Sequence, residues 1–161
     1  MDRTRPARRT IIGNRIPKAP RKRSPPPLAT PRAARPAPHV LVVDDDPDAR
    51  LLLGAMIEAY CAAEVTLCAS VDEAIASAGR VLPDLVVTDA MMPGQDGFDL
   101  IRRMRQVPRA AHVPVIVATA SPEPELHARL LAAGASGILP KPPSPEALVE
   151  VVLARLVAGG D

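Results

Sequence analysis

The chain has 161 residues and a formal net charge of +2, which conceals two parts of opposite charge. Residues 1–38 carry eleven of the twenty Lys and Arg residues and one acid, whereas residues 39–161 carry nine basic and 17 acidic residues. No apolar run approaches the ~20 residues that span a bilayer, no secretory signal is present, and Cys61 and Cys68 are too few for a disulfide framework or a zinc set. We therefore expect a cytoplasmic protein with reduced cysteines.

Residues 1–38 are predicted to form a disordered, basic tail. Nine of the twenty prolines lie there and interrupt any helix or strand, and little apolar material is available to bury. The tail has two interpretations. It is either a solvated extension, without a specific partner or attracted to its own acidic domain, or a segment that binds phosphate-rich partners such as nucleic acid.

Residues 39–158 have the length of one domain, and strands alternate with helices along them; residues 159–161 form the C-terminal end. Buried strands are short runs of apolar and β-branched residues. The strands are expected at His39–Val43, Val65–Cys68, Leu85–Thr88, Val113–Ala118 and Ser136–Leu139.

The helices between these strands are predicted from their start signals. Asp46 followed by Pro47 caps a first helix that runs to about Tyr60, and Ser70 with Glu73 forms a capping box for a second that ends near Gly79. The others are expected from about Phe98 to Gln106, from Ser121-Pro122 to Gly134, and from Ser144-Pro145 to about Ala158. Five alternations of strand and helix favour a doubly wound parallel sheet with helices on both faces.

Reactive side chains follow several of the predicted strands. They are Asp44, Asp45 and Asp46 after the first strand, Asp89 after the third, Thr119 after the fourth and Lys141 after the fifth. These strand ends converge on one crevice in a doubly wound sheet. Two carboxylates ~4 Å apart repel by about 1 kcal/mol in water and about 4 kcal/mol at an effective dielectric of 20. A hard divalent cation relieves that repulsion, and an all-oxygen set with room for water suits Mg²⁺.

A carboxylate beside Mg²⁺, a hydroxyl and an ammonium group can also move a phosphoryl group. Aspartate is a covalent nucleophile in such reactions. The metal and Lys141 would neutralise charge on the phosphoryl oxygens, and Thr119 would donate one hydrogen bond.

The motifs Val42–Pro47, Asp89–Gly97, Thr119-Ala120 and Lys141-Pro142 resemble, in order and spacing, the signatures of receiver domains of two-component response regulators, the chemotaxis regulator type included. The resemblance covers about residues 39–158. It implies a flavodoxin-like, five-stranded sheet in the order 2-1-3-4-5. It also implies that Asp89 accepts phosphate from a sensor histidine kinase or a histidine phosphotransfer protein.

The same resemblance assigns roles within the site. Asp45, Asp89 and the backbone carbonyl of Met91 would bind Mg²⁺ directly, and Asp44 would act largely through water. Thr119 and Lys141 would assist the chemistry, and the bond between Lys141 and Pro142 would be cis.

Two residues depart from the family pattern and concern how the signal is passed on. Ile138 stands where the family usually carries the aromatic switch residue that works with Thr119, and Pro143 stands where a Phe often follows Lys-Pro. We therefore expect the signal to pass through the loop before Ser121 and through the face formed by the fourth helix, fifth strand and last helix. The last helix is more apolar than one buried stripe needs, which suggests an unknown downstream protein or a homodimer contact there.

Three functions follow as hypotheses. The first is a single-domain response regulator, a phosphorylation-dependent switch of protein–protein interactions with no fused output, because only three residues follow Ala158. The second is an enzyme, a phosphatase of the haloacid-dehalogenase type, but residues 44–48 lack its threonine and no acidic pair follows Lys141. The third is a nucleic-acid-binding protein that acts through its basic tail and is regulated by the receiver domain.

Overall fold

The computed structural model describes residues 36–158. The predicted disorder of the tail, and the nucleic-acid contact proposed for it, fall on residues that lie almost wholly outside this range. Within residues 36–158, no helix is long and apolar enough to cross a membrane.

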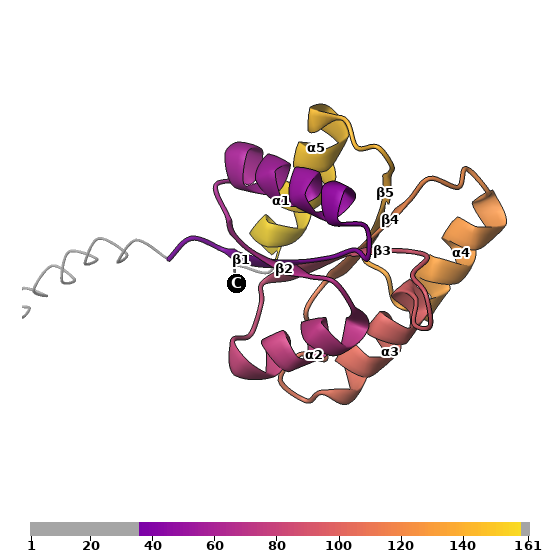
Figure 1. Ribbon diagram of the computed structural model, residues 1–161, viewed down its shortest axis with the longest axis horizontal. Coiled ribbons are helices and arrows are strands. Elements are labelled where there is room, and N and C mark those ends of the chain that lie inside the picture. The colour runs from indigo at the N-terminus through magenta and orange to yellow at the C-terminus, as the bar shows by residue number, and fades with distance from the viewer. Residues whose placement is uncertain (1–35, 159–161) are drawn as a thin grey trace, which may run out of the picture. The chain divides into compact units, whose positions relative to one another are not determined.

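The centre of the fold is a parallel sheet of five strands in the order β2-β1-β3-β4-β5 (Figure 1). This confirms the fold class and the strand order expected from the sequence. The strands are β1 His39–Val43, β2 Glu64–Cys68, β3 Leu85–Asp89, β4 Val115–Thr119 and β5 Gly137–Pro140. Adjacent strands pair so that their carboxyl ends lie along one edge: Val43 pairs with Thr88, Asp89 with Ala118, and Thr119 with Pro140.

Five helices cover the two faces of the sheet. They are α1 Pro47–Cys61, α2 Val71–Arg80, α3 Gly97–Gln106, α4 Pro124–Ala133 and α5 Pro145–Ala158. α1 and α5 lie together on one face, and α2, α3 and α4 lie on the other (Figure 1). Parallel strands joined by helical crossovers give this three-layer arrangement.

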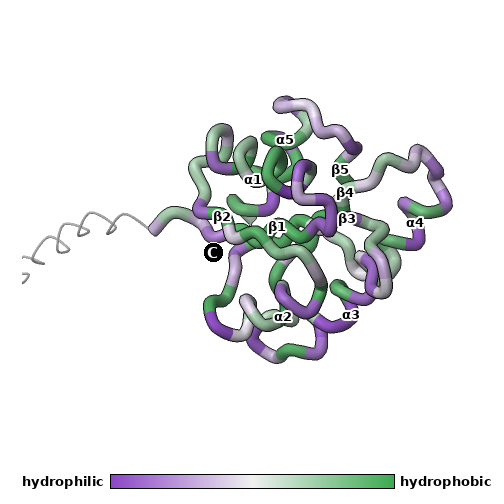
Figure 2. Tube along the Cα trace, viewed as in Figure 1, coloured by the Kyte–Doolittle hydropathy of each residue, from purple (hydrophilic) through white to green (hydrophobic). Residues whose placement is uncertain are grey.

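The core has two layers because neighbouring residues of a strand point to opposite faces. In β1, Val40 and Val42 pack beneath α1 and α5, whereas Leu41 and Val43 pack beneath the other three helices. All four are fully buried. The buried strands β1, β3 and β4 accordingly form the apolar centre of the domain, and the β1 trace is almost wholly hydrophobic (Figure 2).

Three of the predicted helix starts are confirmed by their hydrogen bonds. Asp46 caps α1 by accepting from the backbone N–H of Asp48, and the Ser144 hydroxyl accepts from the N–H of Ala147 at the start of α5. The Ser70 hydroxyl accepts from the N–H of Glu73, as a capping box requires. The Glu73 carboxylate, however, accepts from the N–H of Ala69 rather than from that of Ser70.

The predicted start of the fourth helix is wrong. α4 begins at Pro124, and its N-cap residue is Glu123, which makes no side-chain capping bond. Ser121 lies in the preceding loop, where its hydroxyl accepts from the N–H of Glu123. Serine is a preferred N-cap residue and Ser121 precedes a proline, so residue type favours a start there. The predicted stop is confirmed, because Gly134 ends the helix with φ of 114°, a conformation that glycine adopts at little cost.

The fourth strand begins two residues later than predicted. Pro114 has no N–H to donate and stands just outside the strand, although its carbonyl still accepts from Val86. The N–H of Val115 bonds to the Ser136 hydroxyl, and the strand then continues to Thr119.

Packing accounts for much of the unusual apolar content of α5. Leu148 and Val152 are fully buried, and Val151, Leu153 and Leu156 are partly buried against the same core layer. α5 also packs beside α1, so it covers a helix as well as the sheet. These contacts reduce the apolar surface of α5 that is left for a partner.

Cys61 and Cys68 are both free and buried. Burial raises the pKa of Cys61, and burial together with the nearby Glu73 raises the pKa of Cys68 to about 11. Because the thiolate is the reactive form, we expect neither cysteine to react with a disulfide reagent at pH 8 in the native protein. Both should react once urea unfolds the domain. Rapid native labelling of Cys68 would contradict its placement.

Candidate functional site

The site lies at the carboxyl edge of the sheet, where the ends of four strands bring their side chains together. Asp44 and Asp45 directly follow β1, Asp89 and Thr119 are the last residues of β3 and β4, and Lys141 directly follows β5. Lys141 is tied to the neighbouring strand by its backbone N–H, which donates to the carbonyl of Thr119 at 3.0 Å. The parallel register thus gathers groups that lie far apart in the sequence.

Asp44 is the buried anchor of the site, with a side chain only 2% exposed. Its Oδ2 accepts from Lys141 Nζ at 2.6 Å, and its Oδ1 accepts from the N–H of Asp46 at 3.0 Å. Its backbone carbonyl accepts from Arg50 Nη1 at 2.6 Å. Buried carboxylates are stable only when paired and hydrogen-bonded, and Asp44 meets both conditions.

Asp89 occupies the middle of the site and is 14% exposed. Burial raises the pKa of its carboxyl group, and the charge of Asp44 raises it further. The Lys141 ammonium, with its nitrogen 3.4 Å from Asp89 Oδ1, and the backbone of Met91 act in the opposite direction without cancelling the rise. Asp89 is therefore partly desolvated yet open to solvent on one side, which suits a carboxylate that must meet a second molecule.

Lys141 joins the two carboxylates. Burial alone would lower the pKa of its ammonium group, but the hydrogen bond to Asp44 and the charges of Asp89 and Asp44 raise it overall. The lysine therefore stays charged and is the cation of this cluster. Its peptide bond to Pro142 is cis.

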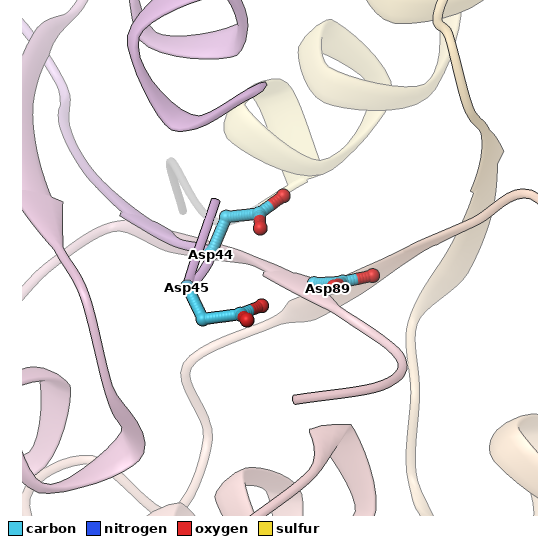
Figure 3. A group of neighbouring side chains, drawn as sticks. All are labelled: Asp44, Asp45 and Asp89. Carbon is cyan, nitrogen blue, oxygen red and sulfur yellow. The ribbon is translucent and has the colours of Figure 1, made fainter. Parts of the chain in front are cut away.

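Asp45 completes the acidic group and is exposed. One carboxylate oxygen from each of Asp44, Asp45 and Asp89 can be chosen so that all three lie within 4.8 Å of one another. Figure 3 shows the Asp44 and Asp45 carboxylates projecting toward the side on which Asp89 lies. Three hard oxygen donors this close, one of them facing solvent, fit a small divalent cation that keeps some water. Asp46, the third acid after β1, instead caps α1.

The turn after Asp89 brings the backbone close to the site. The N–H of Gly97 donates to the carbonyl of Ala90 at 3.1 Å, and a Cβ atom on Gly97 would lie 3.0 Å from the Asp89 carbonyl. Only glycine fits such an approach comfortably. Gly94 has φ of 79°, which turns the chain, and the Met91 side chain is 67% exposed.

Thr119 lies on the other side of Asp89 and is 5% exposed. Its Oγ1 accepts from the N–H of Ser121 at 3.0 Å. Ile138 from β5 lines a cavity of about 360 Å³ together with Thr119, Ser121, His127 and Lys141. Thr119 and Ile138 therefore line the same cavity.

Sequence reasoning missed two contributors. Arg50, one turn into α1, holds the Asp44 carbonyl, and a lone arginine after an acidic run gave no reason to single it out. His127, which belongs to no motif in the sequence, lies on α4, and its Nε2 is 2.8 Å from the Ser121 carbonyl.

Residues 40–153 match the model of the response regulator receiver domain family. An uncharacterized 14.6 kDa protein in the sodA1 3′ region of Leptolyngbya boryana is 42% identical over 113 residues, which are 70% of this chain and 86% of that protein. The response regulator PleD of Caulobacter vibrioides is 38% identical over 105 residues, 65% of this chain but 23% of that much longer protein.

The fold also resembles solved structures. The chemotaxis protein CheY4 of Vibrio cholerae superposes with a TM-score of 0.70 at 28% identity, covering 74% of this chain and 98% of that one. Residues 40–153, which match the family model, include the acidic cluster, Thr119 and Lys141. The chain therefore belongs to the response regulator receiver domain family of two-component signalling.

Proposed function

We propose that this domain accepts a phosphoryl group on Asp89 from a sensor histidine kinase or a histidine phosphotransfer protein, in a reaction that requires Mg²⁺. One observation supports this most strongly: Lys141 Nζ lies 2.6 Å from Asp44 and 3.4 Å from Asp89. A single cation that spans two carboxylates, with a third beside them, leaves the cluster net negative and receptive to a metal ion. The modified domain then switches its interactions with a downstream protein.

In the proposed step, an oxygen of Asp89 attacks the phosphorus of a phosphohistidine. The new O–P bond forms as the N–P bond breaks. The electron pair of the broken N–P bond returns to the imidazole of the phosphohistidine. The Lys141 ammonium group can pair with the phosphoryl oxygens, because its Nζ already lies near Asp89. The Thr119 hydroxyl accepts from Ser121 and keeps its own proton to donate to a phosphoryl oxygen.

Mg²⁺ would be held by Asp45, Asp89 and the Met91 carbonyl, with Asp44 acting largely through water. When bound, it would offset the negative charge that gathers on the phosphoryl oxygens. The proposed water-mediated role of Asp44 is supported by its 2% exposure and by its pairing with Lys141. Asp45 is exposed, and one of its carboxylate oxygens lies within 4.8 Å of those of Asp44 and Asp89.

Asp45→Ala should weaken Mg²⁺ binding by at least about tenfold, the lower end of the effect seen for outer-shell partners of metal ligands. The same change should raise the melting temperature of the metal-free protein, because it removes one of three neighbouring negative charges. Calorimetric titration and thermal unfolding in a chelator measure the two effects. Asp48→Ala is the matched control, since Asp48 is an exposed acid in the first turn of α1. An unchanged Mg²⁺ affinity would rule out the role of Asp45.

The proposed function is tested directly by incubating the protein with acetyl phosphate and Mg²⁺ and measuring its intact mass. We expect a species heavier by one phosphoryl group that forms with Mg²⁺ and fails to form in a chelator. If no such species forms under either condition, the protein does not accept phosphate from this donor and the proposal loses its basis.

A further inference from the structure

The backbone of Ser121, in the loop between β4 and α4, forms hydrogen bonds with two side chains, one through its N–H and one through its carbonyl. Its N–H donates to Thr119 Oγ1 at 3.0 Å, and its carbonyl accepts from His127 Nε2 at 2.8 Å. The first bond ties the loop to the end of β4 within the candidate site. The second ties the same residue to the first turn of α4. Ser121 therefore connects the two elements through two hydrogen bonds in series.

The direction of the second bond follows from its chemistry. A carbonyl oxygen only accepts, so Nε2 of His127 must carry a proton and donate it. His127 lies in the first turn of α4, where its backbone N–H donates to the Glu123 carbonyl at 3.2 Å. It thus joins the helix start to the loop in place of the side-chain cap that Glu123 does not provide.

α4 is lightly held by its other contacts. Leu130 is its one buried residue, and Leu126 is partly buried against the core. The Arg129 guanidinium lies 5.3 Å from the centre of the Phe98 ring on α3. A helix held by so few contacts can respond to a small displacement of the loop that precedes it.

The side chains that line the cavity between the β4–α4 loop and β5 indicate which residue can link Thr119 to α4. The cavity has a volume of about 360 Å³ and is lined by Thr119, Ser121, His127 and Ile138 among others. Ile138 is stiff at χ1 and has no polar group in its side chain, so it cannot form a hydrogen bond that follows Thr119. Among the side chains lining the cavity, the imidazole of His127 is the polar group that already links the loop to a helix.

We propose that His127 is a positioning residue that transmits the state of Asp89 to α4 by holding the Ser121 carbonyl. This rests on the proposed function. When Thr119 donates to a phosphoryl oxygen on Asp89, its Oγ1 shifts and the bond from the Ser121 N–H is lost or redirected. Ser121 then moves, and α4 moves with it because His127 remains hydrogen-bonded to the Ser121 carbonyl. This coupling responds to phosphorylation because only the phosphorylated state gives the Thr119 hydroxyl a phosphoryl oxygen to which it can donate.

The test is hydrogen exchange on the full chain, with Mg²⁺ and with or without beryllofluoride as a mimic of the phosphoryl group. In the wild type, exchange should change around Asp89, in the loop 119–123 and in α4. His127→Ala should keep the changes around Asp89 and in the loop but lose those in α4. His127→Gln should restore them, because its side-chain nitrogen lies at a similar distance from Cα and keeps the N–H donor.

The controls separate the possible failures. His112→Ala removes an exposed histidine between α3 and β4 and should behave as the wild type. An α4 response that survives His127→Ala overturns the coupling alone. A response lost in both His127 variants means that the ring packs rather than donates, which also overturns it. No change around Asp89 in the wild type refutes the proposed function, and the coupling with it. Should His127→Ala fail to fold, His127→Gln with a wild-type response still supports the donor role, and without one refutes it.

Discussion

Asp89→Asn should abolish uptake of the phosphoryl group while leaving the domain folded. The amide keeps the size of the carboxylate but is a far poorer nucleophile, and it weakens the metal set by one charged oxygen donor. We expect the intact mass after incubation with acetyl phosphate and Mg²⁺ to equal that of the untreated variant. The stability should be unchanged or slightly higher, because Asp89 lies beside two other carboxylates and Lys141 retains its bond to Asp44.

Asp48→Asn provides the matched control for this experiment. Asp48 is exposed, lies in the first turn of α1 and is not part of the oxygen cluster. It should take up phosphate as the wild type does. Uptake by Asp89→Asn at the wild-type rate would show that another residue is the acceptor.

Lys141→Met should lower the free energy of unfolding of the metal-free protein by about 3 kcal/mol, the lower end of the cost of removing one partner from a buried ion pair. Asp44 is 2% exposed and would lose the ammonium that lies 2.6 Å from it. Asp89 would at the same time lose its nearest cation. Urea unfolding in a chelator measures the loss, and Mg²⁺ should recover part of it by supplying positive charge to the same carboxylates.

The double variant Asp44→Asn, Lys141→Met separates charge from packing. Asparagine can still accept from the Asp46 N–H, as Asp44 Oδ1 does, and the charge of Asp44 is removed, so only the more exposed Asp89 is left without its cation. The double variant should therefore be more stable than Lys141→Met alone. A single variant as stable as the wild type in the chelator would mean that the ion pair contributes nothing.

Much of the fold follows from the sequence because local and long-range signals agree. The fully buried strands read as unbroken apolar runs that stop at polar residues, and Asp46, Ser70 and Ser144 mark helix starts by well-understood hydrogen bonds. The site could be predicted for the same reason. Once strands are assigned as parallel, their carboxyl ends must share an edge, and Asp44, Asp89, Thr119 and Lys141 all stand at such ends.

The remaining features depend on three-dimensional neighbours. Ser121 and Glu123 each precede a proline, and residue type alone favours the serine as the cap of α4, whereas the structure has Glu123 at that position. The choice is made by the loop, where Ser121 is held by Thr119 and His127. The bond from Arg50 to the Asp44 carbonyl was likewise not foreseen, since it depends on how α1 leaves β1. Such bonds from a helix to a loop have no fixed spacing that a pattern could reveal.

Locating the modified residue shows whether Asp89 is the phosphoryl acceptor. Borohydride delivers one hydride to the carbonyl carbon of an aspartyl phosphate, which expels phosphate and leaves an aldehyde. A second hydride reduces the aldehyde, which leaves homoserine at the modified position. Peptide sequencing by mass spectrometry after acetyl phosphate, Mg²⁺ and borohydride should find homoserine at position 89. Homoserine at position 44, 45 or 46 instead, with unmodified aspartate at 89, would show that Asp89 is not the acceptor.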